Sequence, residues 1–262
     1  MEFDPGPPPT FASLFASVPD HEPHREHFWI DWGPIFYRGR LDGTARILCI
    51  ASDPGATERI AGRTLVGDAG QRVQGFLAKL GLTRSYLCLN AFAYGMFPSH
   101  FFQADEILAE EEQTTWRNAV FDLAKTPQVQ AVVAFGSNAQ VAAAGWTGRG
   151  DLPLVEVHHP SFPDEDVLLE GWRDAVTQLR ALVTPDADGD ATGPNYGQTF
   201  TESEYAPIPA RDLPFGAPPF LGDDRWRREA VPPGRTSVER PFDDILHTLT
   251  WHSPDGSPGG GP

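Results

Sequence analysis

The chain has 262 residues and a formal net charge of −16, with 36 acidic and 20 basic side chains. This length is enough for one large domain with a substantial core. The charge argues against broad electrostatic attraction to nucleic acid, so a nucleic-acid site would need local positive charge and backbone donors. The first residues lack the pattern of a secretory leader and no run approaches membrane-spanning length, so we expect a cytoplasmic protein without membrane contact.

Residues 1–45 are expected to form an extension that packs on the core. A proline-rich start precedes a short helical pattern over residues 10–18. His21, His24 and His27 then recur every third residue, which raises the question of a metal site. The helical zinc-protease spacing requires a second histidine four residues after the first, and Arg25 occupies that position, so we expect no metal here.

Residues 46–184 are expected to form the catalytic core, because apolar runs of strand length alternate with helical patterns there. The expected strands are residues 47–50, 86–89, 129–135 and 154–157, and the expected helices are residues 68–80, 105–124, 137–144 and 164–183. Residues 56–66 are expected to form a loop. The alternation predicts an α/β fold, a three-layer α/β/α sandwich with a central, mostly parallel four-stranded sheet.

Small or polar residues follow all four expected strands: Asp53, Asn90, Gly136-Ser137 and His158-His159. Because the carboxyl ends of parallel strands share one edge, we expect these residues to face one crevice, the usual ligand site of open α/β sheets. Pro54 biases Asp53 away from helical geometry and Gly55 permits a tight turn, so the carboxylate is held at a corner.

Residues 185–262 contain half of the 26 prolines in the chain, so we expect little regular secondary structure. This segment nevertheless keeps many aromatic residues, which fully disordered chains lack. We therefore expect it to wrap over the core in extended form, with a disordered end at residues 253–262.

The chain contains, in this order, Asp53-Pro54-Gly55, the run from Gly62 to Gly70, Leu89-Asn90, Gly136-Ser137 and His159-Pro160-Ser161. Together these motifs, which span about residues 46–183, resemble the uracil-DNA glycosylase superfamily, most of all its family 4 and 5 branches. The resemblance implies a monofunctional hydrolase that flips uracil out of DNA, cleaves its bond to deoxyribose and leaves an abasic site. It implies a monomer associated with the nucleoid, in a bacterium.

Families 4 and 5 would also imply an iron–sulfur cluster, which needs four cysteines. The chain has only Cys49 and Cys88, each inside an expected buried strand. We therefore expect free core thiols, with no metal and no other cofactor.

Base excision builds positive charge on the sugar and negative charge on the departing pyrimidine, so the site must stabilise both. The Asp53 carboxylate suits the sugar side, where it can also orient or deprotonate water. The family 1 motif has its aspartate directly before proline, as Asp53 stands, whereas family 4 places its acid where Ser52 stands. His159 can donate a hydrogen bond to a carbonyl oxygen of the base. The resemblance favours His159 over the competing His158.

An asparagine amide at position 90 can pair with O4 and N3–H of uracil, and the superfamily uses its matching asparagine in this way. Leu65 occupies the position where the family has an aromatic residue that stacks on the base, and Ser52, Pro54 and Gly55 complete the expected substrate-binding turn. The missing ring could come from a nearby aromatic residue: Phe92, Tyr94 or Phe101.

Four further residues are expected to contact DNA. Ser137 and Ser161 offer backbone N–H and hydroxyl groups to phosphates that flank a flipped nucleotide, and Arg63 offers local positive charge. Phe162 stands where the family inserts an apolar wedge into the gap that the base leaves, although a hydrophobic contact that begins the next helix explains it nearly as well.

Two alternatives remain open. The departures at Ser52 and Leu65 also fit a glycosylase for another deaminated or mispaired base, such as hypoxanthine or xanthine. A catalytically silent α/β module that binds nucleic acid or protein partners fits the acidic surface and the aromatic tail.

Overall fold

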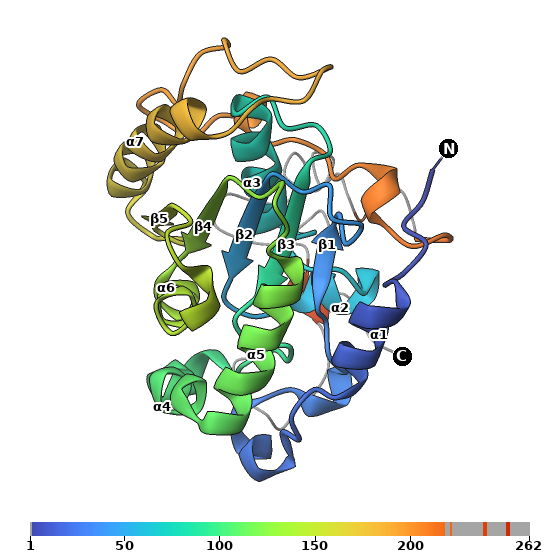
Figure 1. Cartoon of the computed structure of the whole chain (residues 1–262). Coiled ribbons are helices and arrows are strands. Elements are labelled where there is room, and N and C mark those ends of the chain that lie inside the picture. Colours follow the sequence, from blue (N-terminus) through green and yellow to red (C-terminus); the bar gives the residue numbers. More distant parts are fainter. Residues whose placement is uncertain (1, 218–220, 222–237, 240–249, 252–262) are drawn as a thin grey trace.

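The computed structural model describes residues 2–217, 221, 238–239 and 250–251. Its centre is a five-stranded sheet in the order β1-β3-β2-β4-β5 (Figure 1). The strands are β1 (Tyr37–Gly39), β2 (Ile47–Ala51), β3 (Tyr86–Asn90), β4 (Ala131–Phe135) and β5 (Leu154–Val157). β2 to β5 are parallel, and β1 pairs with β3 in the antiparallel direction. The mostly parallel α/β sandwich that the sequence predicts is therefore confirmed.

The number of strands differs from the expected four, because β1 adds an antiparallel edge. Its three residues, Tyr-Arg-Gly, are too short to show a strand period, and they lie in the segment expected to be only an extension. Gly39 fits this edge because its φ is +101° and an added Cβ would overlap the carbonyl oxygen of Tyr86. Residues 1–45 thus contribute a strand to the sheet itself.

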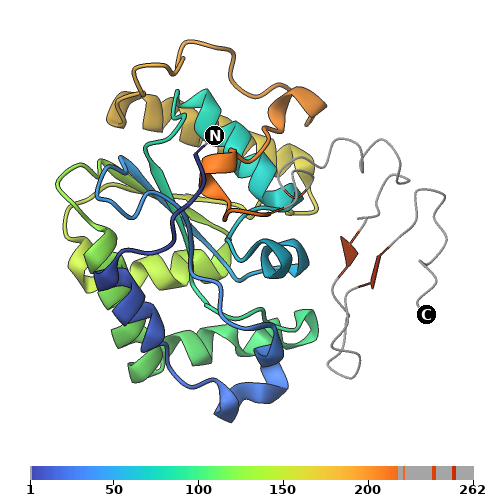
Figure 2. The same ribbon diagram turned by 90° about the vertical axis from the view of Figure 1, so that its right-hand side faces the viewer.

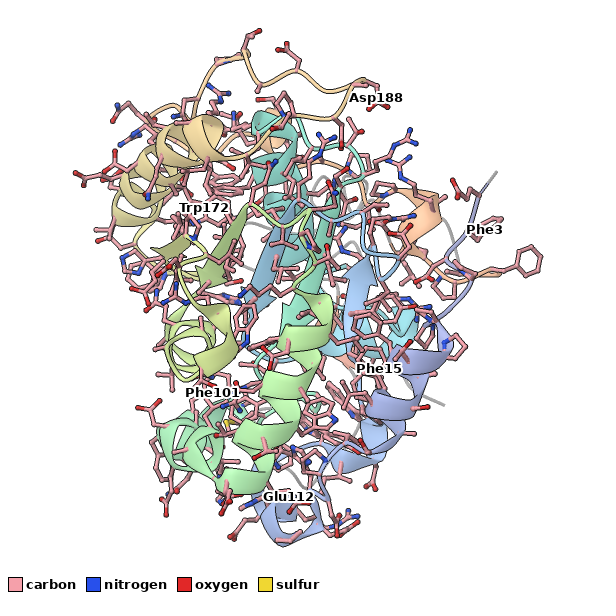
Figure 3. All side chains as sticks on the ribbon, in the orientation of Figure 1. Phe3, Phe15, Phe101, Glu112, Trp172 and Asp188 are labelled. Atoms are coloured by element: carbon pink, nitrogen blue, oxygen red, sulfur yellow. The ribbon has the colours of Figure 1, made fainter. Side chains whose placement is uncertain are left out.

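Successive residues of the central strands face opposite layers, and both faces are buried. Leu48 and Ile50 point into a core with α1 (Pro9–Ala16), α4 (Ala104–Ala109), α5 (Glu111–Ala124) and α6 (Ser137–Ala144). Ile47 and Cys49 point into a second core with α3 (Asp68–Lys79) and α7 (Glu165–Leu182). Figures 1 and 2 both show the sheet between these two groups of helices, and Figure 3 shows Trp172 on the α7 side and Phe15 on the α1 side. Burial on both faces explains why the strands are continuous apolar runs.

Two helical regions differ from expectation. Residues 56–66 are not only a loop, because α2 (Ala56–Ala61) forms there without an apolar stripe that the sequence could reveal. The expected helix 105–124 is two helices, since Glu110 takes an extended ψ of 138° between α4 and α5. α3 begins at Asp68, as expected, with Gly67 at its N-cap position.

Residues 185–217 contain only two short 3₁₀ turns, η5 (Glu202–Glu204) and η6 (Ala210–Asp212). Figure 2 shows the segment of residues 185–217 running across the side of the molecule on which α3 and α7 lie. Two buried carboxylates fasten them: Asp186 accepts the backbone N–H groups of residues 83–85, and Asp212 accepts from Arg38, Arg40 and Tyr86. The two-residue strands β6 (Val238–Glu239) and β7 (Thr250–Trp251) pair with each other. The end expected to be disordered, residues 253–262, lies outside the described residues.

Three further 3₁₀ segments, η1 (Glu22–His27), η2 (Ile30–Trp32) and η3 (Pro98–Gln103), gather near α4 and α5, and η4 (Thr147–Arg149) precedes β5. His24 bonds to Glu110 and His27 to His100, while His21 bonds to the carbonyl of Pro19. The three histidines are therefore directed to three different partners. Across the described part of the chain, no helix is long and apolar enough to cross a membrane.

Candidate active site

A cavity of about 820 Å³ opens at the carboxyl ends of β2, β4 and β5. This volume lies in the range of small-molecule sites. Its walls are the turn after β2, α2, the first turns of α3 and α6, and the loop after β5. Most of the expected site residues line it: Ser52, Asp53, Gly55, Leu65, Ser137, His159, Ser161 and Phe162. The strand ends thus bring residues from positions 52 to 162 into one site.

The Asp53 carboxylate is held at both oxygens. Oδ1 accepts from the Ser52 hydroxyl at 2.8 Å, and Oδ2 accepts from the backbone N–H of Met96 at 3.0 Å. The Ser52 oxygen in turn accepts from Nδ2 of Asn138 at 2.9 Å. Asn138 lies in the first turn of α6 and lines the cavity, but sequence reasoning missed it. Its position directly after Gly136-Ser137, at a strand end expected to face the crevice, is the signal that could have revealed it.

Glu58 is a second residue that sequence reasoning missed. Its buried carboxylate accepts from the backbone N–H of Gly55 at 3.1 Å through one oxygen. The other oxygen accepts from Val66 at 2.7 Å and Gly67 at 2.9 Å. Glu58 therefore ties the turn that carries Asp53 to the turn that carries Leu65. Its position three residues after Gly55, in a helix-capping pattern, is the signal that could have revealed it.

Leu65 is the only non-glycine residue of the described chain with a positive φ, at 53°. A left-handed conformation costs an L-residue roughly 1–2 kcal/mol, so the surroundings must hold it there. Gly70 makes room for this turn, because a Cβ on Gly70 would overlap the carbonyl oxygen of Leu65. The glycines of the Gly62 to Gly70 run thus accommodate a strained turn on the cavity wall.

The His159 ring is oriented by its own loop. Its Nδ1 accepts the backbone N–H of Ser161 at 3.1 Å, so Nδ1 carries no proton and Nε2 is the N–H donor. Gly136 has a φ of +89°, and a Cβ there would lie 2.9 Å from the Cβ of His159. Because Gly136 has no side chain, the end of β4 leaves the space in which His159 packs.

His158 is directed elsewhere and does not line the cavity. Its ring stacks on Phe162 with a centroid distance of 4.2 Å, and its backbone oxygen accepts from Nε1 of Trp172 at 3.1 Å. Neighbouring residues of an extended chain point in opposite directions, which separates the two histidines. His159, and not His158, faces the cavity.

Three expected site residues are not among those that line the cavity. Asn90 pairs with the cavity residue Ala51 in the sheet register, but its Oδ1 accepts from the Thr64 hydroxyl and its side chain is buried. Arg63 donates to Asp4 at 2.6 Å and lies over the ring of Tyr37, 4.8 Å from its centroid. Its expected phosphate contact is not supported, because an acid in the N-terminal extension already binds its guanidinium.

The third such residue, Pro54, is buried beneath the cavity turn. Its carbonyl oxygen lies against Gly95, where an added Cβ would come within 2.8 Å of it. Pro54 therefore shapes the turn that presents Asp53, and the loop after β3 packs against its backbone.

The aromatic candidates for contact with a base are distinguished by burial. Phe92 is buried with Phe28, and the Tyr94 ring packs on His21 at a centroid distance of 4.4 Å. Phe101 lines the cavity and is 41% exposed. In Figure 3 it lies on the side of the sheet where α4 and α6 lie. Phe101 is therefore the ring that can cover a ligand from this side.

The charge inside the cavity is acidic. Asp53, Glu58 and Asp68 line it, and none of the wall residues that the structure describes is lysine or arginine. The first turns of α3 and α6 contribute positive potential, because backbone N–H groups there are not used within the helix. Nowhere in the described residues do three or more His, Cys, Asp or Glu side chains gather so that they could hold a metal ion.

No protein-family model matches the chain, and a search of curated proteins also found no match. The geometry of the cavity and its motifs are therefore the grounds for a functional proposal.

Proposed function

We propose that this chain is a uracil-DNA glycosylase, a monofunctional hydrolase that releases uracil from a flipped-out nucleotide of DNA. One observation carries the proposal: Asp53 and His159 line the same cavity, at the ends of two strands. A carboxylate and an imidazole N–H donor are the two groups that an oxocarbenium-like sugar and a departing pyrimidine anion require. The resemblance of the surrounding motifs to the superfamily supports the same reaction.

Asp53 acts on the sugar side in this proposal. The Ser52 hydroxyl and the Met96 amide each occupy one lone pair of its carboxylate and fix its plane. The carboxylate so oriented can accept a proton from water or face the cationic sugar carbon. Because the carboxylate is oriented before substrate arrives, little reorganisation is needed in the transition state.

His159 acts on the base side. In this proposal Nε2–H is the donor, because Nδ1 accepts the Ser161 amide. A hydrogen bond from Nε2–H to a carbonyl oxygen of the base strengthens as the bond to the sugar breaks and the base gains negative charge. The imidazole thus stabilises the leaving group without having to transfer its proton.

The base would lie between Leu65 and Phe101, which both line the cavity. Ser137 and Ser161 at the cavity rim would contact the flanking phosphates, and Phe162 would fill the gap left in the duplex. The proposed partner is therefore uracil-containing DNA, bound by a cytoplasmic monomer that uses water and its own side chains.

Another deaminated base is the second candidate substrate. Asn90, which would read the uracil edge, bonds to Thr64 and does not line the cavity. Selectivity for uracil therefore requires the Asn90 amide, whose buried Nδ2 has no hydrogen-bond partner among the described residues, to become accessible from the cavity. A glycosylase for hypoxanthine or xanthine does not depend on that access.

The test is single-turnover base release from labelled oligonucleotides that carry uracil, hypoxanthine, xanthine or thymine opposite guanine. We expect uracil release, and we expect Asp53→Asn and His159→Ala to lower its rate by roughly 10²- to 10⁴-fold. Asp68→Asn is a matched control, since it also removes one carboxylate from the cavity wall. Release of no base at all, with retained binding to single-stranded DNA, would contradict the proposal and favour a binding module.

A further inference from the structure

Arg72 connects three parts of the molecule that are distant in sequence. It lies on α3, beside the loop that carries His159. Its Nη1 donates to the carbonyl oxygen of Pro160 at 2.7 Å, and its Nε donates to the Tyr205 hydroxyl at 2.9 Å. The guanidinium also lies over the ring of Phe200, 4.3 Å from the centroid. Phe200 and Tyr205 belong to the C-terminal extension.

We propose that Arg72, held by Phe200 and Tyr205, positions His159, so that the C-terminal extension is a working part of the active site. This inference rests on the proposed function for its kinetic consequence. Arg72 does not line the cavity, so it acts through the loop and not on the substrate.

The connection runs through a single peptide group. The Pro160 carbonyl that accepts from Arg72 and the Ser161 N–H that donates to His159 Nδ1 belong to the same peptide unit. This unit is planar and rigid, so a fixed oxygen also fixes the direction of the N–H. A cationic donor on the oxygen further polarises the unit and strengthens the N–H as a donor. Arg72 therefore influences both the rotation of the imidazole and which of its nitrogens carries the proton.

An arginine suits this position better than a lysine. The planar guanidinium directs separate N–H groups to two acceptors on different segments, and its face stacks on an aromatic ring at the same time. A lysine ammonium would keep the charge but could not keep both hydrogen bonds and the stacking together. Arg72→Lys should consequently recover only part of the effect of Arg72.

The extension is docked closely around Arg72. The backbone N–H of Ala206 donates to the carbonyl of Gln71 at 3.1 Å, next to Arg72 in the chain. One turn further along α3, a Cβ on Gly75 would overlap the carbonyl oxygen of Glu204. The backbone N–H of Phe200 donates to Glu165 at 2.7 Å, which joins the extension to α7 as well. These contacts fix the rings that hold the guanidinium.

Arg173 provides a matched control. It lies on α7 and donates to the carbonyl oxygen of Gly197 in the same extension at 2.6 Å. Its described side-chain contact therefore secures the extension without reaching the His159 loop. If Arg72 merely fastened the extension, the two arginines should be equivalent.

The experiment compares Arg72→Met, Arg72→Lys, Tyr205→Phe and Arg173→Met in the full chain. The single-turnover rate constant for uracil release should fall about 10- to 100-fold for Arg72→Met, with less than a twofold change in the enzyme concentration that gives half of the maximal rate. Arg72→Lys and Tyr205→Phe should fall between this variant and the wild type, and Arg173→Met should keep the wild-type rate. Equal losses in Arg72→Met and Arg173→Met, or no loss in either, would overturn the proposal.

A second readout needs no substrate. Long-range ¹H–¹⁵N spectra of the histidine rings report which nitrogen of His159 is protonated, and Arg72→Met should shift its Nδ1 signal while Arg173→Met should not. An unchanged His159 signal in Arg72→Met refutes the positioning role. A changed signal in a protein whose wild type releases no uracil refutes the glycosylase and leaves the positioning contact standing.

Discussion

The two walls of the cavity are held in different ways. The Asp53 wall is fixed by residues of the core: Ser52, Glu58, Met96 and Asn138 all lie within the α/β sandwich. The His159 wall is fixed partly by the core, through Gly136, and partly by Arg72 and the extension behind it. The extension thus supports the His159 wall through the hydrogen bonds of Arg72, whereas it meets the Asp53 wall through apolar packing of Ile208 and Leu213 on Ala61 and Val66.

This difference predicts separate consequences for substitutions on the two walls. Changes around Asp53 should act through the hydrogen bonds of its own carboxylate and of Glu58. Changes to Arg72 should act on His159 through the Pro160–Ser161 peptide.

Glu58→Ala should have the largest effect, because it removes the acceptor of three backbone N–H groups on the Asp53 wall. Buried donors without a partner cost about 1–3 kcal/mol each, so the free energy of unfolding should fall by at least this amount. The strained Leu65 turn loses its anchor, and uracil release should fall by roughly 10² or more. Urea unfolding and single-turnover kinetics measure the two effects. Glu58→Gln keeps an acceptor oxygen and should lie between; equal losses in both variants would contradict this role.

Gly136→Ala should affect the His159 wall more than the stability of the fold. The new Cβ would meet the Cβ of His159 at 2.9 Å, and a φ of +89° is strained for alanine. Displacement of the ring should lower uracil release by roughly 10-fold to 10²-fold. As a control, Gly62→Ala also places alanine at a positive φ, where the described part of the chain has no atom beyond the neighbouring residues within 4 Å of the new Cβ. Full activity in Gly136→Ala would show that His159 does not depend on this space.

Ser52→Ala should have a smaller effect. It removes the hydroxyl that joins Asn138 to Oδ1 of Asp53, but the Met96 amide still holds Oδ2. One net hydrogen bond corresponds to about a 3- to 10-fold lower rate. Asn138→Ala should lower the rate no further when it is combined with Ser52→Ala, because both act through the same hydroxyl. Additive losses in the double variant would refute this chain of contacts.

Asp186→Asn should change stability while barely changing the rate of uracil release, since Asp186 fastens the start of the extension far along the chain from Tyr205. Burial raises the pKa of its carboxyl, but the hydrogen bonds from Ser85, Arg84 and Thr83 outweigh this and leave the pKa below its usual value. The carboxylate therefore stabilises the fold above the pKa of the unfolded chain, and this contribution is lost as the pH falls through the folded pKa. Urea unfolding should show a deficit of about 1–3 kcal/mol at pH 7 that shrinks below about pH 4. A deficit that does not vary with pH would contradict this.

The sequence predicts the architecture well because buried parallel strands are continuous apolar runs. It also indicates which residues follow the strands, and the structure brings Asp53, Ser137 and His159 into one cavity. β1 and α2 were not predictable, since a three-residue edge strand and a helix without an apolar face leave no period in the sequence. These elements depend on their neighbours more than on their own residues.

The supporting contacts of the site are less predictable than its motifs. Nothing in the sequence indicates an ion-pair partner for Arg63, but Asp4 binds its guanidinium in the folded chain. The sequence does not reveal the partners of Arg72 either, because Pro160 and Tyr205 lie far from it along the chain. Such contacts are set by the three-dimensional arrangement, because side chains that carry no local pattern meet only after the chain has folded.

The central claim is that Asp53 and His159 act on opposite sides of one nucleotide. A crystal structure of Asp53→Asn bound to a uracil-containing oligonucleotide tests it most directly, since asparagine keeps the shape of the aspartate while removing its charge. The account predicts a flipped uracil in the cavity, with the sugar carbon at position 53 and a base oxygen within hydrogen-bonding distance of Nε2 of His159. A nucleotide bound elsewhere, or a base that reaches only one of the two residues, would contradict it.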